Sequence, residues 1–188
     1  MPELILASQS PRRRELLAAA GFRFTVRSRP VEETRAAGEE PGDYARRLAR
    51  AKAEAAWRRG DEIVLGADTI VVLDDRVFEK PADACAARSM LRSLSGREHA
   101  VITGICLRHG GGVVVDSEST HVHFLPLDDG EIDEYVSSGE PMDKAGAYAI
   151  QGRASKFVGR IEGCYFNVMG LPLALVYRHW KALTMRAG

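Results

Sequence analysis

Apolar and polar positions alternate along the first third of the chain in a pattern that predicts strands separated by helices. The apolar run at residues 4–7 predicts a buried strand, and residues 11–20 predict a helix. Alternating apolar positions at residues 22–26 predict a second strand. After a loop at residues 29–42, we expect Asp43 to cap a long helix. The apolar face expected on that helix is formed by Tyr44, Leu48, Ala51 and Ala55.

The central part of the chain is rich in predicted strands. Residues 63–73 form an apolar, β-branched run that residues 67–69 interrupt, and the two aspartates that follow it predict a turn. Residues 101–108 and 113–125 predict two long strands, and the glycine-rich segment between them indicates a hairpin.

Three further helices complete the pattern. One follows Pro81, and a short acidic one covers residues 127–138, with Asp128 or Asp129 as its cap. The last begins after residues 170–172. The apolar stripes expected on the first and last of these helices are Ala87, Met90, Leu91 and Leu94, and Leu173, Val176, Tyr177 and Trp180. Early alternation of strands and helices, with a long antiparallel pair in the middle, predicts an α/β fold whose mixed sheet is covered by helices.

Composition narrows the class of protein and of ligand. With 188 residues, 45% of them hydrophobic, the chain fits a single globular domain over residues 1–188. Its 26 basic residues balance its 26 acidic ones, and the two kinds are interleaved. Proteins that grip long nucleic acids are usually basic or carry a basic stripe. A small anionic ligand is therefore favoured over a nucleic acid.

The cysteines and the apolar segments bear on the compartment. Cys85, Cys106 and Cys164 form no C-x-x-C pair, so the sequence predicts neither a zinc knuckle nor a disulfide framework. Unpaired cysteines suit a reducing compartment, and no segment approaches the ~20 apolar residues that span a bilayer. The N-terminal segment has no apolar core of the kind found in signal peptides. We therefore expect a cytoplasmic protein with no membrane association.

The start of the first predicted helix combines Ser10 and Pro11 with Arg12, Arg13 and Arg14. Ser is a favoured N-cap and Pro a favoured first helical residue, and a helix start presents free N–H groups and a positive dipole end. Guanidinium groups added there favour binding of a polyphosphate. The alternative is an arginine-rich helix start that faces water.

Asp68 lies between two apolar β runs. An ionised carboxylate is costly to bury there unless a cation or hydrogen-bond donor pairs with it or it serves a function. The interpretation we favour is a metal ligand, a general base that acts on water, or both. The alternative is a strand-end turn in which Asp68 caps nearby N–H groups. Glu32 or Glu33 could join it around Mg²⁺, although solvated loop acids are the simpler interpretation. Lys52 and Lys80 could neutralise phosphate charge or be ordinary surface lysines.

The segment 143–152 is rich in small residues, which let backbone approach backbone or ligand closely. Gln151 within it offers one acceptor and two donors, which match the edge of a pyrimidine base. The alternative is an exposed Gln on a glycine-flanked strand. His121 and His123 share one face of a predicted strand, but without an evident third ligand we interpret them as part of a polar sheet face.

Several of these blocks together resemble the Maf family of nucleotide pyrophosphatases, over residues 4–183. The resemblance implies an α/β fold with an elongated mixed sheet flanked by helices, similar to the inosine triphosphate pyrophosphatase architecture, and a cleft between two lobes. It implies hydrolysis of a nucleoside triphosphate to the monophosphate and pyrophosphate with a divalent cation, Mg, Mn or Co. The blocks that carry it are residues 7–13, 66–69, 79–81, 143–152 and 170–172.

The resemblance further indicates the branch of the family that acts on dTTP and UTP, through Arg12, Thr69 and Gln151. It implies that Asp68 is the catalytic base and that the protein forms a homodimer. The phosphate or metal contacts that it implies are Ser10, Arg13, Glu33, Lys52 and Lys80, with Glu33 and Asp68 as the metal ligands. The alternatives are a purine-type or 7-methyl-GTP pyrophosphatase, or a regulator of cell division that binds nucleotides without turnover.

Overall fold

The computed structural model describes residues 3–185 and divides the chain into two compact units. The first unit comprises the residues up to Thr69, Thr103–Glu118 and the residues from Gly170 onward. The second unit comprises Ile70–Ile102 and Ser119–Met169. A single domain over residues 1–188 stays a prediction.

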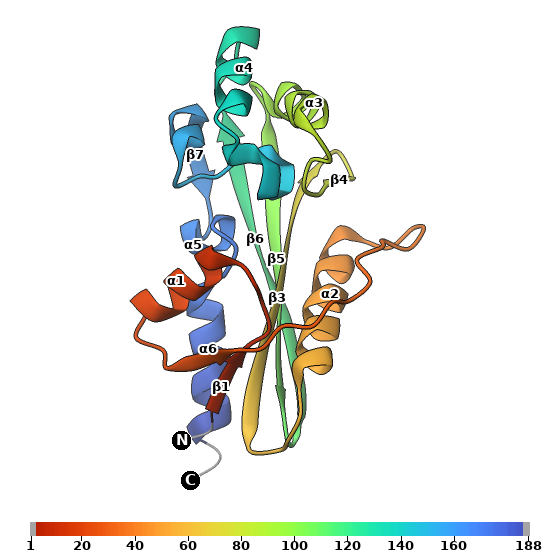
Figure 1. Cartoon of the computed structure of the whole chain (residues 1–188), viewed down its shortest axis with the longest axis vertical. Coiled ribbons are helices and arrows are strands. Elements are labelled where there is room, and N and C mark those ends of the chain that lie inside the picture. The colour runs from red at the N-terminus through yellow and green to blue at the C-terminus, as the bar shows by residue number, and fades with distance from the viewer. Residues whose placement is uncertain (1–2, 186–188) are drawn as a thin grey trace. The chain divides into compact units, whose positions relative to one another are not determined.

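The strands form one seven-stranded sheet in the order β2-β1-β3-β5-β6-β7, with β4 paired to β3 outside this path (Figure 1). The strand β1 runs parallel to β2 and β3, whereas β4 is antiparallel to β3 and β7 is antiparallel to β6. The sheet is therefore mixed, as predicted. The strands are β1 (Glu3–Leu6), β2 (Phe24–Val26), β3 (Glu62–Leu73), β4 (Arg76–Phe78), β5 (Glu98–His109), β6 (Gly112–Phe124) and β7 (Val158–Glu162).

Six α-helices and three short 3₁₀ helices accompany the sheet in the described part of the chain. The α-helices are α1 (Pro11–Ala19), α2 (Pro41–Ala56), α3 (Ala84–Leu94), α4 (Asp129–Ser137), α5 (Tyr165–Val168) and α6 (Leu173–Met185). The 3₁₀ helices are η1 (Glu140–Asp143), η2 (Ala145–Ala147) and η3 (Arg153–Phe157).

In the first unit, two strand glycines bring α2 directly onto the sheet. A Cβ atom at Gly66 of β3 would lie 2.1 Å from the carbonyl oxygen of Ala49, and one at Gly104 of β5 would lie 2.3 Å from that of Ala45. Only residues without a side chain permit this approach of helix backbone to strand backbone. In Figure 1, α2 flanks β3 on one side, and α1 and α6 lie on the other.

The second unit is built around an aromatic cluster. The ring of Phe124 packs edge-on against Tyr148 and His99, and Tyr135 packs edge-on against Phe157. Helix α3 adds buried Ala87, Leu91 and Leu94, as its predicted stripe required, and Met90 is partly buried against the same core. Edge-to-face contacts of this kind add to the burial of apolar area in stabilising a core.

The predicted turn and helix cap that depend only on neighbouring residues are confirmed. The β3–β4 turn has positive φ angles of 47° at Asp74 and 62° at Asp75, as a two-residue hairpin turn requires. Asp128 is the N-cap of α4 and forms a reciprocal capping box with Glu131. The cysteines are free, as predicted. Among the described residues, none of the helices is long and apolar enough for a membrane span.

Four predictions about elements are wrong, two of them in part. Residues 67–69 do not interrupt a strand, because β3 is continuous and its backbone hydrogen bonds do not depend on the side chain of Asp68. Asp43 lies in the first turn of α2, whose N-cap is Glu40. Two apolar stripes are also wrong in part, because packing against the sheet selects a neighbouring helix face. On α2, Ala51 is half-buried and Ala55 exposed, whereas Ala49, Ala53 and Ala56 are buried. On α6, Leu173 and Trp180 are half-buried and Tyr177 is exposed, whereas Leu175 is buried beside Val176.

Candidate active site

The carboxyl end of β1 lies beside the first third of β3. The two strands are parallel with Leu6 opposite Leu65, and the N–H of Ala7 donates to the Leu65 carbonyl at 2.8 Å. The strand β1 then gives way to α1, whereas β3 continues through residues 66–69. Ligands of α/β proteins bind at such carboxyl ends of parallel strands. The topology therefore brings two of the predicted motifs together within the first unit.

Asp68 is held by a lysine that α2 supplies. Gly66 and Asp68 are two residues apart on β3 and thus face the same side of the sheet, the side on which α2 lies. Lys52, between Ala49 and Ala53 on α2, extends its ammonium to 2.5 Å from Oδ1 of Asp68. The same ammonium lies 2.8 Å from Oε1 of Glu33. One cation therefore joins two carboxylates from a strand and a loop.

Arg13 is anchored on the other face of β3, the face of Thr69. Its Nε donates to the carbonyl of Gly170 at 2.8 Å, and its two terminal nitrogens donate to the hydroxyls of Ser8 at 3.1 Å and Thr69 at 3.0 Å. The Thr69 hydroxyl also bonds that of Thr103 at 2.9 Å. A planar guanidinium suits such a fixed set of acceptors.

Burial is the largest influence on the pKa values of Asp68 and Arg13. The side chain of Asp68 is only 12% exposed. Desolvation raises the pKa of Asp68 above its ordinary value, although the charges of Lys52 and Arg13 oppose the shift. Burial likewise lowers the pKa of Arg13, against the opposing effect of Asp68. A buried carboxylate with a raised pKa, next to two cations, is a typical functional-site feature.

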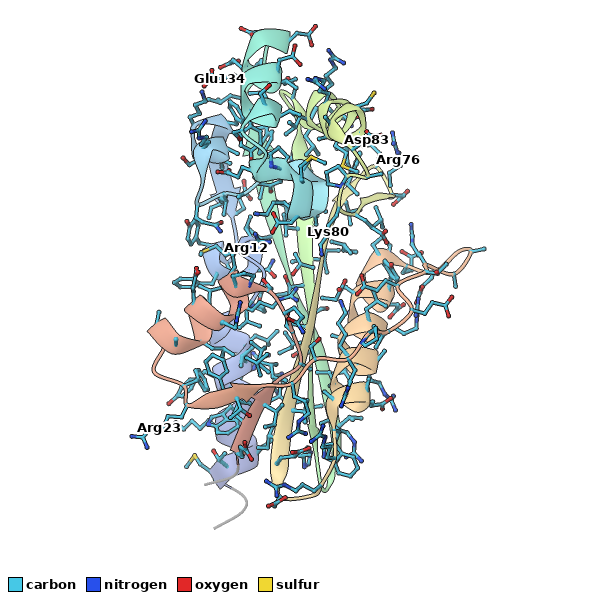
Figure 2. The ribbon with its side chains drawn as sticks, in the orientation of Figure 1. Arg12, Arg23, Arg76, Lys80, Asp83 and Glu134 are labelled. Carbon is cyan, nitrogen blue, oxygen red and sulfur yellow. The ribbon has the colours of Figure 1, made fainter. Side chains whose placement is uncertain are left out.

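Ser10 and Arg12 lie at the start of α1. Ser10 is the N-cap residue and precedes Pro11, as predicted, but its side chain makes no capping hydrogen bond. Its N–H donates instead to the hydroxyl of Ser8 at 3.2 Å. Arg12 lies next to Arg13 on the helix and is half-buried (Figure 2). The alternative of an arginine-rich helix start that only faces water does not hold for Arg13.

Lys80 and Gln151 belong to the second unit, whereas Asp68 belongs to the first. Lys80 is exposed on the segment after β4 (Figure 2), and Gln151 is exposed on a turn. The N–H of Gly146 donates to the carbonyl of Glu79 at 3.2 Å, which links the two segments. Gly146 is closely approached by a side chain, because a Cβ atom there would lie 2.8 Å from the side chain of Val71.

The donor set fits a divalent cation that a substrate helps to hold. In the described residues, no group of three or more His, Cys, Asp or Glu side chains is arranged as a metal site. Glu33 and Asp68 nevertheless share one cationic group, the ammonium of Lys52. Mg²⁺ is commonly bound by one or two carboxylates together with substrate phosphates.

His121 and His123 pair with Glu98 on a polar sheet face, as predicted.

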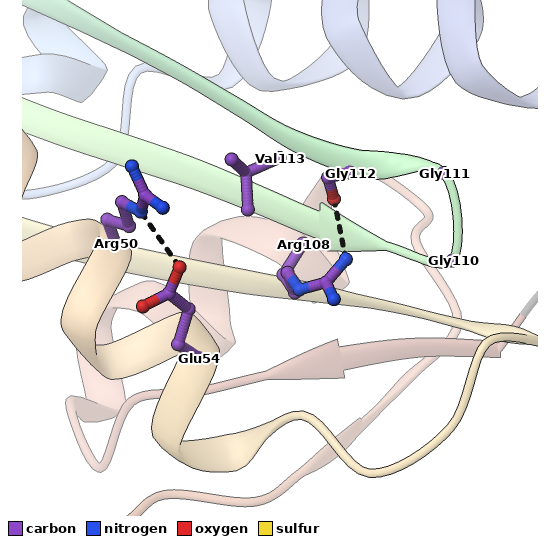
Figure 3. Close-up of a pocket in the computed structure, with 7 residues that line it drawn as sticks. All are labelled: Arg50, Glu54, Arg108, Gly110, Gly111, Gly112 and Val113. Carbon is purple, nitrogen blue, oxygen red and sulfur yellow. Dashed lines mark hydrogen bonds and ion pairs between the residues drawn. The ribbon is translucent and has the colours of Figure 1, made fainter.

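A shallow pocket in the first unit lies away from these residues. It is lined by Arg50 and Glu54 of α2 and by Arg108 with the glycines of the β5–β6 hairpin (Figure 3). Arg50 pairs with Glu54 at 2.8 Å, and the Arg108 guanidinium lies 3.9 Å from the centre of the Trp57 ring. Its charged groups are thus engaged with one another and with the hairpin.

Sequence reasoning missed the residues that hold the predicted ones in place. Ser8, Thr103 and the carbonyl of Gly170 fix Arg13 and Thr69, and Gly66 lets α2 present Lys52. Ser8 and Gly170 stand inside motifs that the sequence singled out, whereas Thr103 lies in a predicted strand without any distinguishing signal.

Known proteins of similar sequence cover nearly the whole chain. The family model described as Maf-like protein matches residues 3–183. A "dTTP/UTP pyrophosphatase" of Koribacter versatilis is 54% identical over 93% of this chain and 91% of its own. One of Anaeromyxobacter dehalogenans, with the same description, is 51% identical over 100% of this chain and 95% of its own.

A more distant likeness links the chain to a solved structure. The crystal structure of a nucleoside-triphosphatase, described as a dITP/XTP pyrophosphatase from Mycobacterium abscessus, is 17% identical with a TM-score of 0.41. The match covers 66% of this chain and 75% of the other, and it is too remote to carry a conclusion. The family model and the close relatives are sufficient by themselves: the chain belongs to the family of Maf-like proteins.

Proposed function

We propose that the protein is a nucleoside triphosphate pyrophosphatase that hydrolyses dTTP and UTP to the monophosphate and pyrophosphate. The description of relatives at 54% and 51% identity supports this substrate class. The observation that carries the proposal is the ammonium of Lys52, which lies between the carboxylates of Asp68 and Glu33. A cationic site next to a buried acid suits hydrolysis of a polyphosphate.

In this proposal Asp68 is the general base. Its pKa is raised by burial, which makes it a better proton acceptor than an ordinary aspartate, and the charge of its partner Lys52 favours the ionised form. Asp68 takes a proton from water as the water oxygen bonds to the α-phosphorus. The bond from that phosphorus to the bridging oxygen breaks, and pyrophosphate leaves. Positioning and charge stabilisation supply most of the rate in such phosphoryl transfers.

The triphosphate binds, in the same proposal, to the start of α1 and to cations near it. Arg13 is held rigid by Ser8, Thr69 and Gly170, so it binds phosphate with little loss of side-chain freedom. The remaining phosphate contacts proposed are Ser10, Arg12, Lys52 and Lys80.

Glu33 and Asp68 would hold a divalent cation, Mg, Mn or Co. Such a cation neutralises phosphate charge when it is bound. The ammonium of Lys52 lies between the two carboxylates and would share their negative charge with such a cation. The Glu33 side chain is 53% exposed, so its second carboxylate oxygen would be accessible to the cation.

Base recognition is assigned to Gln151, with Thr69 and Arg12 in support. The exposed amide of Gln151 matches the donor and acceptor pattern of a uracil or thymine edge. We propose further that the protein is a single domain, a homodimer and cytoplasmic, and that it acts on small nucleotides without nucleic-acid or membrane partners. The balanced charge of the chain supports the choice of a small ligand.

The test is incubation of the purified protein with UTP and Mg²⁺, followed by detection of pyrophosphate. Parallel rates on dTTP, inosine triphosphate and 7-methyl-GTP identify the branch of the family. Faster turnover of UTP and dTTP is expected. Preferred turnover of a purine nucleotide contradicts the pyrimidine assignment, and binding of UTP without pyrophosphate release would indicate a nucleotide-sensing regulator.

A further inference from the structure

The turn that carries Gln151 is fastened at both ends by two side chains with no part in the reaction proposed above. The turn is closed by a hydrogen bond of 3.0 Å from the N–H of Gly152 to the carbonyl of Ala149. Gln151 lies inside it with its side chain exposed. Within residues 3–185, no hydrogen bond holds that side chain, so the backbone of the turn alone sets the position and direction from which it extends. We call residues 149–152 the Gln151 turn.

Both ends of the Gln151 turn bind the segment formed by α4 and η1. At its start, the N–H of Ala149 donates to the hydroxyl of Tyr135 at 3.2 Å. Directly after it, the N–H of Arg153 donates to both carboxylate oxygens of Glu140, at 3.0 and 3.1 Å. The Tyr135 hydroxyl in turn donates to Glu140 Oε1 at 2.9 Å. One carboxylate and one phenol therefore link the two ends.

Packing makes this link tight. A Cβ atom at Gly152 would lie 2.3 Å from Glu140 Oε1, so the carboxylate rests directly against the glycine. The φ angle of Gly152 is −101°, which other residues adopt, so a larger residue there would act by displacing the Glu140 carboxylate and not by straining the backbone. Tyr135 is buried, and its ring packs edge-on against Phe157 at 5.5 Å. Hydrogen bonds to a charged acceptor are stronger than neutral ones, and a half-buried acceptor is exposed to less competition from water.

We infer that Glu140 and Tyr135 are positioning residues that set the direction of Gln151 and thereby the selectivity for the base. The inference rests on the proposed function, because it assigns the selectivity to Gln151. Both residues act on Gln151 through the backbone of the turn and are assigned no contact with the nucleotide. A site that recognises a base by hydrogen bonds loses discrimination when its donors and acceptors move out of line.

The experiment compares Glu140→Ala and Tyr135→Phe with the wild-type protein on UTP and CTP. CTP presents an amino group where UTP presents a carbonyl. We expect the ratio of kcat/KM for UTP over CTP to fall by about tenfold or more in each variant, because the wild-type site depends on aligned hydrogen bonds. The change should appear in KM for UTP, whereas kcat should stay within about threefold. Glu140→Gln retains an acceptor oxygen for the Arg153 N–H and should retain most of the selectivity.

Two controls separate positioning from loss of stability. Asp83→Ala removes another carboxylate of the second unit that accepts a backbone hydrogen bond, from the N–H of Ala86 at 2.7 Å (Figure 2). It should lower the melting temperature without changing the UTP to CTP ratio. Glu140→Ala added to Gln151→Ala should lower the ratio no further, because both act through one side chain. An unchanged ratio in folded Glu140→Ala overturns the inference.

Amide hydrogen exchange gives a result that needs no activity. Exchange at residues 149–153 should be about tenfold faster in Glu140→Ala and unchanged there in Asp83→Ala, because only the first variant frees the turn. Unaltered exchange at residues 149–153 in Glu140→Ala contradicts the inference that Glu140 holds the Gln151 turn. A wild-type protein that hydrolyses no nucleoside triphosphate contradicts the proposed function instead, so the two failures are distinguishable.

Discussion

The ammonium of Lys52 lies 2.5 Å from Oδ1 of Asp68, although the two residues are 16 positions apart in the chain. The pairing depends on Gly66, which faces the same side of β3 as Asp68 and lets α2 lie against the strand. The Asp68 carboxylate therefore has one close cationic partner, Lys52, at a poorly solvated position, where burial raises its pKa.

Replacement of Lys52 by Ala should move the acidic limb of the kcat/KM profile to higher pH. The charge of Lys52 lowers the pKa of Asp68, against the larger effect of burial, so its removal raises that pKa further. A base must be ionised to act, and activity therefore appears only at higher pH. Rates on UTP between pH 5 and 9 measure the limb, with Lys52→Arg as the control that keeps the charge. A limb that moves to lower pH would contradict the electrostatic assignment.

Replacement of Asp68 by Asn should lower kcat by about 10²–10⁴-fold, the range expected for loss of a general base. The amide occupies the same volume, so circular dichroism should report an unchanged fold. Pyrophosphate release under saturating UTP measures the effect. Near-normal turnover in this variant would remove Asp68 from the mechanism.

Replacement of Gly66 by Ala should lower both stability and activity. The new Cβ atom would lie 2.1 Å from the carbonyl oxygen of Ala49, so α2 must shift away from β3. Overpacking of this kind costs about 1–3 kcal/mol of unfolding free energy and separates Lys52 from Asp68. Urea unfolding and UTP turnover measure the two effects.

Gly60→Ala is the matched control for the Gly66 variant. A Cβ atom at Gly60 would meet its nearest neighbour at 3.7 Å, an ordinary contact. That variant should unfold within about 0.5 kcal/mol of the wild type. Equal stability of the Gly66 and Gly60 variants would contradict the role given to the close approach of α2.

Replacement of Arg13 by Lys should lower kcat/KM for UTP even though the charge is retained. A single ammonium cannot reproduce the bonds that the guanidinium makes to Ser8, Thr69 and Gly170. Loss of buried hydrogen bonds costs about 1–3 kcal/mol of unfolding free energy. Arg14→Lys, at an exposed position of the same helix, is the control and should leave both quantities unchanged. Equal kinetics of the two variants would exclude a specific role for Arg13.

The ion pair between Arg27 and Glu62 should make stability fall in acid. Burial alone raises the pKa of Glu62, but hydrogen bonds from Arg27 and from the N–H groups of Arg58 and Arg59 outweigh it and lower that pKa below 4.5. An acid with a lowered pKa in the folded state stabilises the fold above its ordinary pKa of 4.5 and loses that contribution as the pH falls.

Urea unfolding of the wild type and of Arg27→Ala between pH 7 and pH 3 measures this contribution. The Glu62 side chain is fully buried, so the variant should lose about 3–5 kcal/mol at pH 7. Its stability should also depend less on pH between 5 and 3. A wild-type stability that rises on acidification would contradict the assigned sign.

Much of the candidate site could be predicted because its motifs are compact in sequence. The Ser10–Arg13 helix start and the carboxylate of Asp68 are recognisable from residue type and neighbours alone. Their supporting partners were not predictable, because the hydroxyl of Thr103 and the carbonyl of Gly170 reach Thr69 and Arg13 only through the fold. The break predicted at Asp68 was wrong for a related reason. A polar residue inside an apolar run is typical of a turn. The sequence does not show that Lys52 of another segment pairs with this carboxylate and so lets the strand continue.

Features that depend on residue type and near neighbours follow from the amino-acid sequence alone. These are the Asp74-Asp75 turn, the Asp128 cap of α4, the mixed α/β class and the resemblance to one family. Three features emerge only once the chain is folded: the buried face of α2, the pairing of Lys52 with Asp68, and the hold of Glu140 and Tyr135 on the Gln151 turn. Caps and turns are formed by hydrogen bonds and sterics within a few residues. These pairings instead arise from packing between segments far apart in the chain, and no local pattern encodes that packing.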